Sequence, residues 1–375
     1  MRICLVSAAY RPYLSGVGEH VYNLARQLAA RGHEVRLLTA RYSPPGPQPD
    51  PPLVSRMGTT LIVRWRTGHF TLPVGWNLSR AVKRFISERS FDIVHCHGVF
   101  PPEIAYWATI HARVPVVTTF HWSFVPPSMF RLPLRLAFAG INDRIAARIA
   151  VSAACRDWVS PLFPGEYDVI NNGVDTQHFR PDAQPPSSIA PLRRSILYVG
   201  RLDGRKGLPA LLKAMPGVLR EVPEVRLLVV GAGPLERHCR AMCRRMNISE
   251  SVTFAGPVEP DYLPGYYAGS TIYVSPAVGR ESMGIVLIEA MACGRAVIAS
   301  DIPGYNEVIQ QDRNGLLVPE SDHAALAAAI VRLLKDEHLR RRIETGALER
   351  AADFAWPRIT DQIESVYQRV LHRGR

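Results

Sequence analysis

Long apolar runs are missing from this sequence of 375 residues. No segment approaches the ~20 consecutive apolar residues that a membrane-spanning helix requires. The first ten residues run directly into Arg11 and Pro12, so we expect them to form a first buried strand rather than a secretory signal. Both observations favour a globular protein without a membrane-spanning segment.

Cysteine is also scarce, with six residues at positions 4, 96, 155, 239, 243 and 293. Cys239 and Cys243 lie one helical turn apart, but no matching Cys or His pair completes a zinc site. We therefore expect reduced, buried thiols rather than disulfides or structural zinc. Neither half opens with a G-x-G-x-x-G loop after a strand, which disfavours a nicotinamide-binding oxidoreductase.

Acidic residues are few in the first part of the chain. Residues 1–150 carry 18 Lys and Arg against 7 Asp and Glu, a balance of +11, whereas residues 151–375 carry 27 against 26, a balance of +1. Such a local excess of positive charge favours an anionic partner, either a membrane surface or a nucleic acid. Because basic residues do not interleave with aromatic ones and no nucleic-acid-binding motif occurs, the membrane surface is favoured.

Two domains of alternating strands and helices are predicted from the length and the hydrophobic pattern. In the first half, strands are expected at residues 2–8, 34–39, 61–65, 93–97, 114–120 and 149–152, with helices at 18–31 and 80–88. In the second half, strands are expected at 195–199, 225–231, 252–255, 271–275 and 296–300, with helices at 208–219, 235–245, 284–292 and 324–335. The fold class is therefore α/β, with two Rossmann-like, doubly wound parallel sheets.

The expected domain boundaries follow from composition. Residues 1–185 form the first domain and residues 192–355 the second, with a linker rich in proline and serine at 181–191. A second proline-rich stretch, residues 42–52, is expected to be a loop. The closing amphipathic segment, 356–375, lies beyond the last strand and is expected to pack back on the first domain.

The most informative motif runs from Glu281 through Ser282, Met283 and Gly284 to an apolar helical stretch that contains Glu289. Glycine and serine at the start of a helix leave backbone N–H groups available for an anion such as a diphosphate. The two carboxylates on either side can bind hydroxyl groups, and a diphosphate with hydroxyls on both sides is a nucleotide sugar. The spacing alone is equally compatible with an ordinary helix start flanked by acids.

Two further loops have the composition of phosphate-binding turns. The glycines in Gly16-Val17-Gly18 allow a positive φ and close approach of the backbone to a diphosphate or sugar, although an ordinary turn is an equal alternative. Arg201 and Lys206 follow a predicted strand, and a planar guanidinium and a mobile ammonium both suit phosphate oxygens.

Taken together and in this order, the motifs resemble those of GT-B-fold retaining glycosyltransferases of family 4, which include sucrose synthases and phosphatidylinositol mannosyltransferases. The resemblance covers essentially the whole chain. It rests on Gly16-Val-Gly-Glu-His-Val21, Asp92-Ile-Val-His-Cys-His97, Thr119-Phe-His-Trp122, Ile149-Ala-Val-Ser152, Asn171-Asn-Gly-Val-Asp175, Val199-Gly-Arg-Leu-Asp-Gly-Arg-Lys-Gly207, Val230-Gly-Ala-Gly-Pro234 and residues 281–294. Within the family, the phosphatidylinositol alpha-mannosyltransferases of actinobacteria are the most similar branch.

This resemblance implies a set of site residues. Arg201 and Lys206 would neutralise the leaving diphosphate, His121 would lie near the reacting anomeric carbon, Glu281 would bind hydroxyls of the donor sugar, and Glu289 would bind the ribose. His95 and His97, on one face of a strand, are supporting candidates. The remaining donor-binding candidates are Gly16, Val17, Gly18, Gly231, Gly233, Pro234, Val258, Ser282, Met283, Gly284 and Ile285.

The reaction implied is transfer with retention, in which the leaving phosphate helps to deprotonate the incoming hydroxyl on the same face of the sugar. No Asp-x-Asp sequence occurs. This fits the family, in which cationic residues and a helix dipole stabilise the diphosphate, so we expect neither a metal nor another cofactor.

The acceptor is expected to be a membrane lipid. Arg80, Lys83 and Arg84 fall on one face of a predicted helix preceded by Trp76, a pattern that suits anionic lipid but also an ordinary solvated helix face. The resemblance favours mannose transfer from GDP-mannose to phosphatidylinositol or a related glycolipid, by a cytoplasmic enzyme peripheral to the inner face of the membrane. The alternative is a UDP-sugar donor with a soluble or polyprenyl-linked glycan acceptor, and the unmatched loop at 42–52 leaves the head group open.

Overall fold

The computed structural model describes residues 1–12, 15–42, 53–65, 68–75, 77–121, 127–187, 194–279 and 281–373. The chain divides into two compact units, one formed by Met1–Gly173 with Trp356–Arg375 and one formed by Val174–Ala355. We call these unit 1 and unit 2. Most of the predicted loop at 42–52, the end of the predicted linker (188–191), Trp76 and Trp122 lie outside the described residues.

The first unit ends earlier than predicted. Residues 174–185 belong to unit 2 rather than to unit 1. The N–H of Val174 donates to the carbonyl oxygen of Phe354 at 2.8 Å, and Phe179 packs against the apolar core of unit 2. The proline-rich stretch at 181–191 therefore lies several residues after the point at which the chain leaves unit 1.

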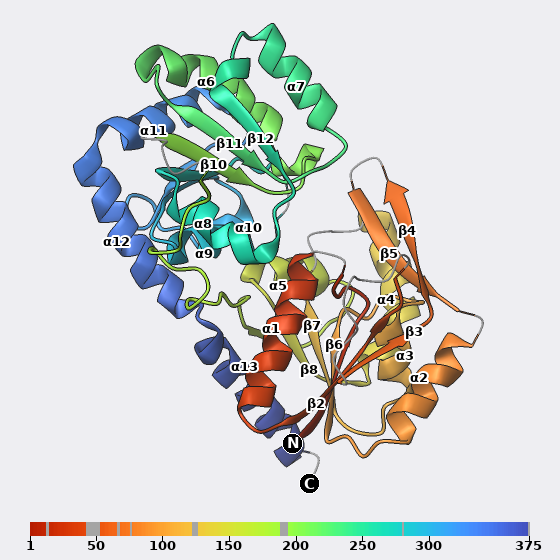
Figure 1. Ribbon diagram of the computed structural model, residues 1–375. Helices are drawn as coiled ribbons and strands as arrows, with labels where there is room; N and C mark the ends of the chain where they lie inside the picture. The colour runs from red at the N-terminus through yellow and green to blue at the C-terminus, as the bar shows by residue number, and fades with distance from the viewer. Residues whose placement is uncertain are drawn as a thin grey trace. The chain divides into compact units, whose positions relative to one another are not determined.

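Unit 1 is built on a parallel sheet whose strand order, across the described residues, is β3-β2-β1-β6-β7-β8-β9. The strands are β1 (Arg2–Ser7), β2 (Glu34–Ala40), β3 (Val54–Met57), β6 (Ile93–His97), β7 (Val116–Phe120), β8 (Ile145–Ala150) and β9 (Tyr167–Val169). The helices are α1 (Gly16–Ala30), α2 (Leu78–Ser87), α3 (Ile104–His111), α4 (Ser128–Asn142), α5 (Ala153–Val159) and α13 (Trp356–Arg373). Both faces of this sheet are covered by helices (Figure 1).

Successive strand residues point to opposite faces, and both faces are apolar. In β1, Cys4 and Val6 join the core under α2, α3, α4 and α5, whereas Ile3 and Leu5 join the core under α1 and α13. Helices that connect parallel strands cover both faces of a sheet, and this double burial explains why the strands read as continuous apolar runs. The segment at the C-terminus, α13, packs beside α1 within unit 1 (Figure 1).

Unit 2 repeats this plan. Its parallel sheet has the order β12-β11-β10-β13-β14-β15 over the residues that are described. The strands are β10 (Ser195–Val199), β11 (Arg226–Val230), β12 (Val252–Gly256), β13 (Ile272–Ser275), β14 (Ala296–Ser300) and β15 (Leu316–Val318). The helices are α6 (Leu208–Glu221), α7 (Glu236–Arg245), α8 (Leu263–Ala268), α9 (Ile285–Ala292), α10 (Pro303–Asn306), α11 (His323–Lys335) and α12 (Glu337–Asp353), with short 3-10 turns η1 (Gly204–Lys206), η2 (Ser249–Ser251) and η3 (Pro260–Tyr262).

The predicted strand at 61–65 is present but does not join the large sheet. It lies in β4 (Thr59–Trp65), which pairs antiparallel with β5 (Gly68–Val74). Only two residues separate β4 from β5 in sequence, whereas a parallel pair needs a crossover of a dozen or more. The place beside β2 is taken by β3.

All six cysteines are buried and free, as predicted. Within the described residues, no helix is both long enough and apolar enough to cross a membrane.

Candidate active site

The predicted donor-binding residues of unit 2 gather at one edge of its sheet. Arg201 and Lys206 follow β10, Gly231 and Gly233 follow β11, and Glu281 follows β13. Strands β11, β10 and β13 are neighbours, and the strand order reverses between β10 and β13. In doubly wound sheets, ligands bind outside the carboxyl ends of the strands at such a reversal.

The loop after β10 is organised by Asp203, which the sequence analysis did not single out. Its Oδ1 accepts hydrogen bonds from the backbone N–H groups of Arg205 and Lys206 at 3.0 and 3.2 Å, and so caps η1. Its Oδ2 lies 3.5 Å from Nε of Arg201. The buried carboxylate therefore holds the two predicted phosphate-binding side chains on one short turn.

Lys206 and Glu281 form the central contact of this edge. The ammonium Nζ lies 2.9 Å from Oε1 and 3.0 Å from Oε2 of the carboxylate. Their side chains are only 23% and 12% exposed, so the pair is largely shielded from water while an edge remains accessible. The structure thus brings together a predicted phosphate ligand and a predicted sugar ligand from distant parts of the sequence.

The turn that leads into α9 depends on Gly284. Its φ is +84°, and an added Cβ would lie 2.4 Å from the ring of Tyr305. This left-handed turn ends directly before Ile285, the first residue of α9, so the free N–H groups of the helix N-terminus lie beside Ser282 and Gly284. The side chain of Met283 is fully buried in the core of unit 2, so it cannot contact a ligand.

Glu289 lies inside α9 and is held by a buried phenol. Tyr267 donates its O–H to Oε2 of Glu289 at 2.9 Å. Burial, followed by the negative charge of Glu289, raises the pKa of Tyr267 well above its ordinary value. The phenol therefore stays protonated and orients the carboxylate of Glu289.

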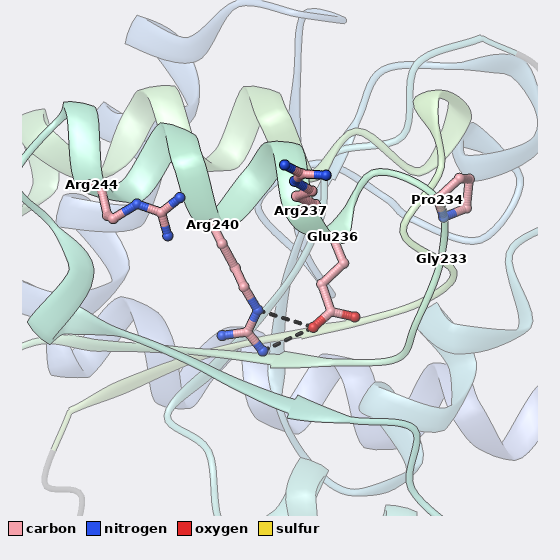
Figure 2. Close-up of a pocket in the computed structure, with 6 residues that line it drawn as sticks. All are labelled: Gly233, Pro234, Glu236, Arg237, Arg240 and Arg244. Atoms are coloured by element: carbon pink, nitrogen blue, oxygen red, sulfur yellow. Dashed lines mark hydrogen bonds and ion pairs between the residues drawn. The ribbon is translucent and has the colours of Figure 1, made fainter.

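The glycines after β11 are required by close packing. An added Cβ would lie 2.0 Å from the carbonyl oxygen of Gly200 at Gly231, and 2.5 Å from that of Leu202 at Gly233. Gly233 and Pro234 form one end of a groove of about 410 Å³ whose other lining residues come from α7. Figure 2 shows Arg240 in this groove turned toward Glu236, with which it is paired at 2.9 Å. Val258, after β12, packs partly buried against the core of unit 2.

A cluster of histidines lies at the corresponding edge of the unit 1 sheet. His95 and His97 lie on β6, His121 follows β7, and His20 lies in the second turn of α1. Nδ1 of His97 and Nε2 of His121 share a hydrogen bond of 3.2 Å. The ring centroid of His20 is 5.3 Å from that of His97 and 4.9 Å from that of His121.

His95 supports the cluster from behind. Its Nδ1 is hydrogen-bonded to the hydroxyl of Tyr367 at 2.6 Å and its Nε2 to that of Thr119 at 2.7 Å. Its ring stacks on His97 with centroids 4.5 Å apart, so the expectation that both histidines share one face is confirmed. Because both nitrogens of His95 are bonded within the protein, it is a packed neighbour of the other rings.

The histidines are held in the neutral state. Burial lowers the pKa of His20 to about 4, an effect that Asn172 opposes, and lowers the pKa of His95 to about 3. Burial and the neighbouring histidines also hold the pKa values of His97 and His121 well below the usual range. Neutral imidazoles can bind a metal ion, and one ring nitrogen from each of His20, His97 and His121 lies within 4.8 Å of the other two.

The glycine loop at the start of α1 differs from the prediction. Gly16, Val17 and Gly18 lie inside the first turn of the helix, and neither glycine has a positive φ. Ser15 caps the helix by accepting the N–H of Gly18 at 3.0 Å. Any contribution of these residues to ligand binding therefore comes from a helix N-terminus rather than from a left-handed turn.

His20 and Glu103 were not predicted from the sequence. His20 lies four residues after Gly16, a spacing that places it on the same helix face, and this was the signal that could have revealed it. Glu103 follows β6, and burial raises the pKa of its carboxyl from 4.5 to about 7. No periodicity or motif marks Glu103, because its environment is created only by the fold.

The predicted acceptor residues lie on a solvated helix face. Arg80, Lys83 and Arg84 are all exposed on α2, whereas its apolar residues face the core. The guanidinium of Arg84 pairs with Glu88 at 2.6 Å. The helix α2 therefore offers charge to an anionic surface, but no apolar side chain that could enter one.

The helix α4 offers what α2 lacks. Met129, Phe130, Leu132 and Leu136 are 74%, 51%, 64% and 68% exposed, and they are four of the seven large apolar side chains exposed among the described residues. No acidic residue lies in α4, whose sequence also contains two exposed arginines. Exposed apolar groups gathered on one element, with positive charge between them, are typical of an interaction surface.

The chain thus consists of two doubly wound units, one of which has a cationic turn, a helix N-terminus and two carboxylates at its switch point. The chain belongs to glycosyltransferase family 4. It matches the model described as "Glycosyltransferase Family 4" over residues 14–178 and the one described as "Glycosyl transferases group 1" over residues 193–336.

Comparison with individual proteins agrees with this assignment. The chain is 34% identical to the phosphatidyl-myo-inositol mannosyltransferase of Mycolicibacterium smegmatis over 378 residues, covering 100% of this chain and 95% of the relative. It superposes on the sucrose-phosphate synthase of Thermosynechococcus elongatus with a TM-score of 0.79 and 25% identity, over 99% of each chain. HepE of Anabaena, solved in complex with UDP-glucose, has a TM-score of 0.75 at 21% identity, over 98% of this chain and 99% of that one. The predicted GT-B fold is thereby confirmed.

Proposed function

We propose that this glycosyltransferase acts with retention and moves mannose from GDP-mannose to a membrane lipid, either phosphatidylinositol or a related glycolipid. The observation that carries the proposal is the Lys206–Glu281 pair at the N-terminus of α9. It occurs in a chain that is similar over its whole length to proteins named for mannosyl transfer to phosphatidyl-myo-inositol.

The geometry of unit 2 supports a role in stabilising the leaving group. Arg201 and Lys206 present positive charge on a turn fixed by Asp203, and the N-terminus of α9 adds its N–H groups and the positive end of its dipole. Charge that develops on the diphosphate as the bond to the anomeric carbon breaks would meet these preorganised groups. Glu281 is suited to bind hydroxyls of the sugar.

Retention then requires no protein nucleophile. The acceptor oxygen forms the new bond on the face that the diphosphate leaves, and the departing phosphate oxygen takes the acceptor proton. His121 is proposed to contact the sugar near the anomeric carbon, as the resemblance implies. In this scheme the electron pair of the broken C–O bond stays with the nucleotide diphosphate.

No metal is required in this proposal, because the cationic turn and the helix N-terminus supply the positive charge. We expect turnover to persist in excess EDTA. Complete loss of turnover with the chelator, restored by magnesium or manganese, would show instead that a metal assists the leaving group.

A lipid acceptor is supported by the surface of unit 1. Within this unit α2 packs against α3 and α3 against α4, so the basic helix and the helix with exposed apolar residues share α3 as a neighbour. Positive charge attracts anionic head groups, and the apolar side chains can enter the interface. We therefore propose peripheral attachment to the membrane through α2 and α4.

The donor is tested by thermal-shift measurements with GDP-mannose, UDP-glucose and UDP-N-acetylglucosamine. A ligand that binds only the folded chain raises its melting temperature by mass action. We expect the largest shift with GDP-mannose, and a reduced shift for Glu281→Ala. A shift with a UDP-sugar alone would reject the proposed donor and favour a UDP-sugar enzyme acting on a soluble or polyprenyl-linked glycan.

A further inference from the structure

Three histidines of unit 1 converge from separate elements on one point. His20 comes from α1, His97 from the end of β6, and His121 from the residue after β7. One ring nitrogen of each lies within 4.8 Å of the others. Elements separated by many residues in sequence therefore present three nitrogen donors to a common centre.

The distances fit coordination to a single ion. A tetrahedral zinc ion with Zn–N bonds of about 2.0–2.1 Å holds its nitrogens about 3.3 Å apart. Nδ1 of His97 and Nε2 of His121 are already 3.2 Å apart. One ring nitrogen of His20 lies within 4.8 Å of the donor atoms of the other two histidines, so all three rings offer a nitrogen to the same centre.

The surrounding contacts indicate which histidines can bind an ion. His95 is committed through both nitrogens to Tyr367 and Thr119, and it backs His97 by stacking. Trp356 packs against His20 from another side, with ring centroids 5.1 Å apart. These contacts support two of the rings from behind, and His121 is the least buried of the three.

We propose that His20, His97 and His121 form a binding site for a divalent transition-metal ion of the zinc class, and that an ion bound there inhibits sugar transfer. Three imidazoles suit zinc, copper, nickel or cobalt, and they disfavour magnesium, which prefers oxygen ligands. The claim that the ion inhibits transfer rests on the proposed function, because the ion would occupy His121, which that function places beside the sugar. The binding half stands on the geometry alone.

Binding is tested on the full chain after EDTA treatment and dialysis, by calorimetric titration with zinc chloride and, separately, magnesium chloride. We expect one equivalent of zinc to bind and magnesium not to compete. His20→Asn and His97→Gln should each weaken zinc binding at least about tenfold, as the loss of metal-site residues commonly does. Cobalt should give the visible absorption of a low-symmetry tetrahedral site, and this absorption should be lost in both variants.

The matched controls are His238→Ala and His338→Ala, two exposed histidines of unit 2. Circular dichroism and the donor-induced thermal shift verify that each variant is folded. If the controls weaken zinc binding as much as the cluster variants do, or if the cluster variants bind as the parent does, the site is rejected.

Inhibition is tested by assaying transfer with and without zinc. We expect zinc to suppress turnover, EDTA to restore it, and His20→Asn to require at least about tenfold more zinc for the same fractional inhibition. Histidine-dependent zinc binding that leaves transfer unaffected overturns the inhibitory half. If zinc binds at the histidines but the chain transfers no sugar, the metal site is supported and the proposed function is rejected. If the chain transfers sugar but zinc does not bind at the histidines, the proposed function is supported and the metal site is rejected.

Discussion

Lys206 and Glu281 test the donor site at the scale of single residues. Each contacts charge or hydroxyl groups that matter most in the transition state, where one lost contact is worth roughly 3 kcal/mol. We expect Lys206→Ala and Glu281→Ala each to lower turnover by about 10²-fold or more. The measurement is kcat with saturating donor, together with a melting curve to establish that the fold is intact.

Arg205 supplies the control for this prediction. It lies on the same turn as Lys206, but its side chain is 44% exposed and its nearest acidic contact is Asp203 at 3.8 Å. Arg205→Ala should therefore leave turnover within about twofold of the parent, since weak exposed pairs contribute little. Activity within a factor of two for Lys206→Ala or Glu281→Ala would contradict the assigned roles.

Glu103 makes the stability of the chain depend on pH. Its carboxyl has a pKa of about 7 in the folded chain against 4.5 ordinarily, because it is buried. Above pH 4.5 the unfolded chain ionises first while the folded chain keeps the proton, so stability is lost as pH rises toward 7. Removing this carboxyl by Glu103→Gln should stabilise the chain relative to the parent by about 2–3 kcal/mol at pH 8.

The measurement is urea unfolding of parent and variant at pH 4.5 and at pH 8. At pH 4.5 the parent carboxyl is protonated in the folded state, so the two chains should differ little. A stability difference that is the same at both pH values would mean that the carboxyl titrates normally.

Single residues also show what the sequence could and could not reveal. Lys206, Glu281, Gly284 and Glu289 could be selected as candidates because each lies in a continuous motif, and the structure brings Lys206 and Glu281 into contact. His20 and Asp203 lie within such motifs, but their roles arise from contacts that only the folded loop or helix creates. The spacing of a motif identifies which residues act together, whereas burial and partner identity depend on the rest of the chain.

At the scale of elements, α4 is the part of unit 1 most suited to enter a lipid interface. Burying an apolar side chain such as phenylalanine or leucine is worth about 1.5–3 kcal/mol when complete. We expect Phe130→Ser with Leu136→Ser to weaken binding to vesicles by about tenfold or more, at low and at high salt alike, because salt does not screen apolar burial. Sedimentation with phosphatidylglycerol vesicles measures this.

Tyr262 and Leu348 provide the comparison for α4. Both are exposed apolar residues of unit 2, at 67% and 40%. Tyr262→Ser with Leu348→Ser should leave vesicle binding unchanged. Equal binding by the α4 variant and the parent would remove α4 from the proposed membrane surface, and a dimer detected by light scattering, dissociated by the α4 substitutions, would assign this face to a second copy of the chain.

Elements were predicted best where packing is two-sided. The strands that form both sheets read as short apolar runs, and β10 to β14 of unit 2 were predicted nearly at their observed bounds, whereas the three-residue strand β15 was not predicted. The helices α4 and α12 were not predicted, because α4 buries only Phe138 and Ile141 fully and leaves four large apolar residues exposed, whereas α12 is mostly polar, so neither shows a clear apolar stripe. The short strand β3 was missed for a similar reason, since all its residues are only partly buried.

At the scale of the whole molecule, the division into two similar units was predictable from the restart of the strand–helix pattern. The two units do not simply follow one another along the chain, because the C-terminal helix α13 belongs to unit 1 and packs beside α1. Its amphipathic pattern indicated that it needed a partner, but only the fold identifies that partner as the helix that carries His20.

The uneven distribution of charge leads to the last prediction. Residues 1–150 carry nearly all of the net charge, and Arg80, Lys83 and Arg84 place three of these charges on the exposed face of α2. Replacing all three by Ser should weaken binding to anionic vesicles by up to about 1 kcal/mol per charge, less for Arg84 because Glu88 already pairs with it. At about 0.5 M salt, where the Debye length is well below 10 Å, parent and triple variant should bind alike.

Sedimentation with phosphatidylinositol or phosphatidylglycerol vesicles, at low and high salt, gives the comparison. Donor affinity should be the same in both proteins, because the substituted residues lie in unit 1 and the donor-binding loops in unit 2. Loss of donor binding in the triple variant would indicate that the substitutions disturb more than the α2 surface. Equal sedimentation at low salt would remove the electrostatic basis for a lipid acceptor and favour the soluble glycan alternative.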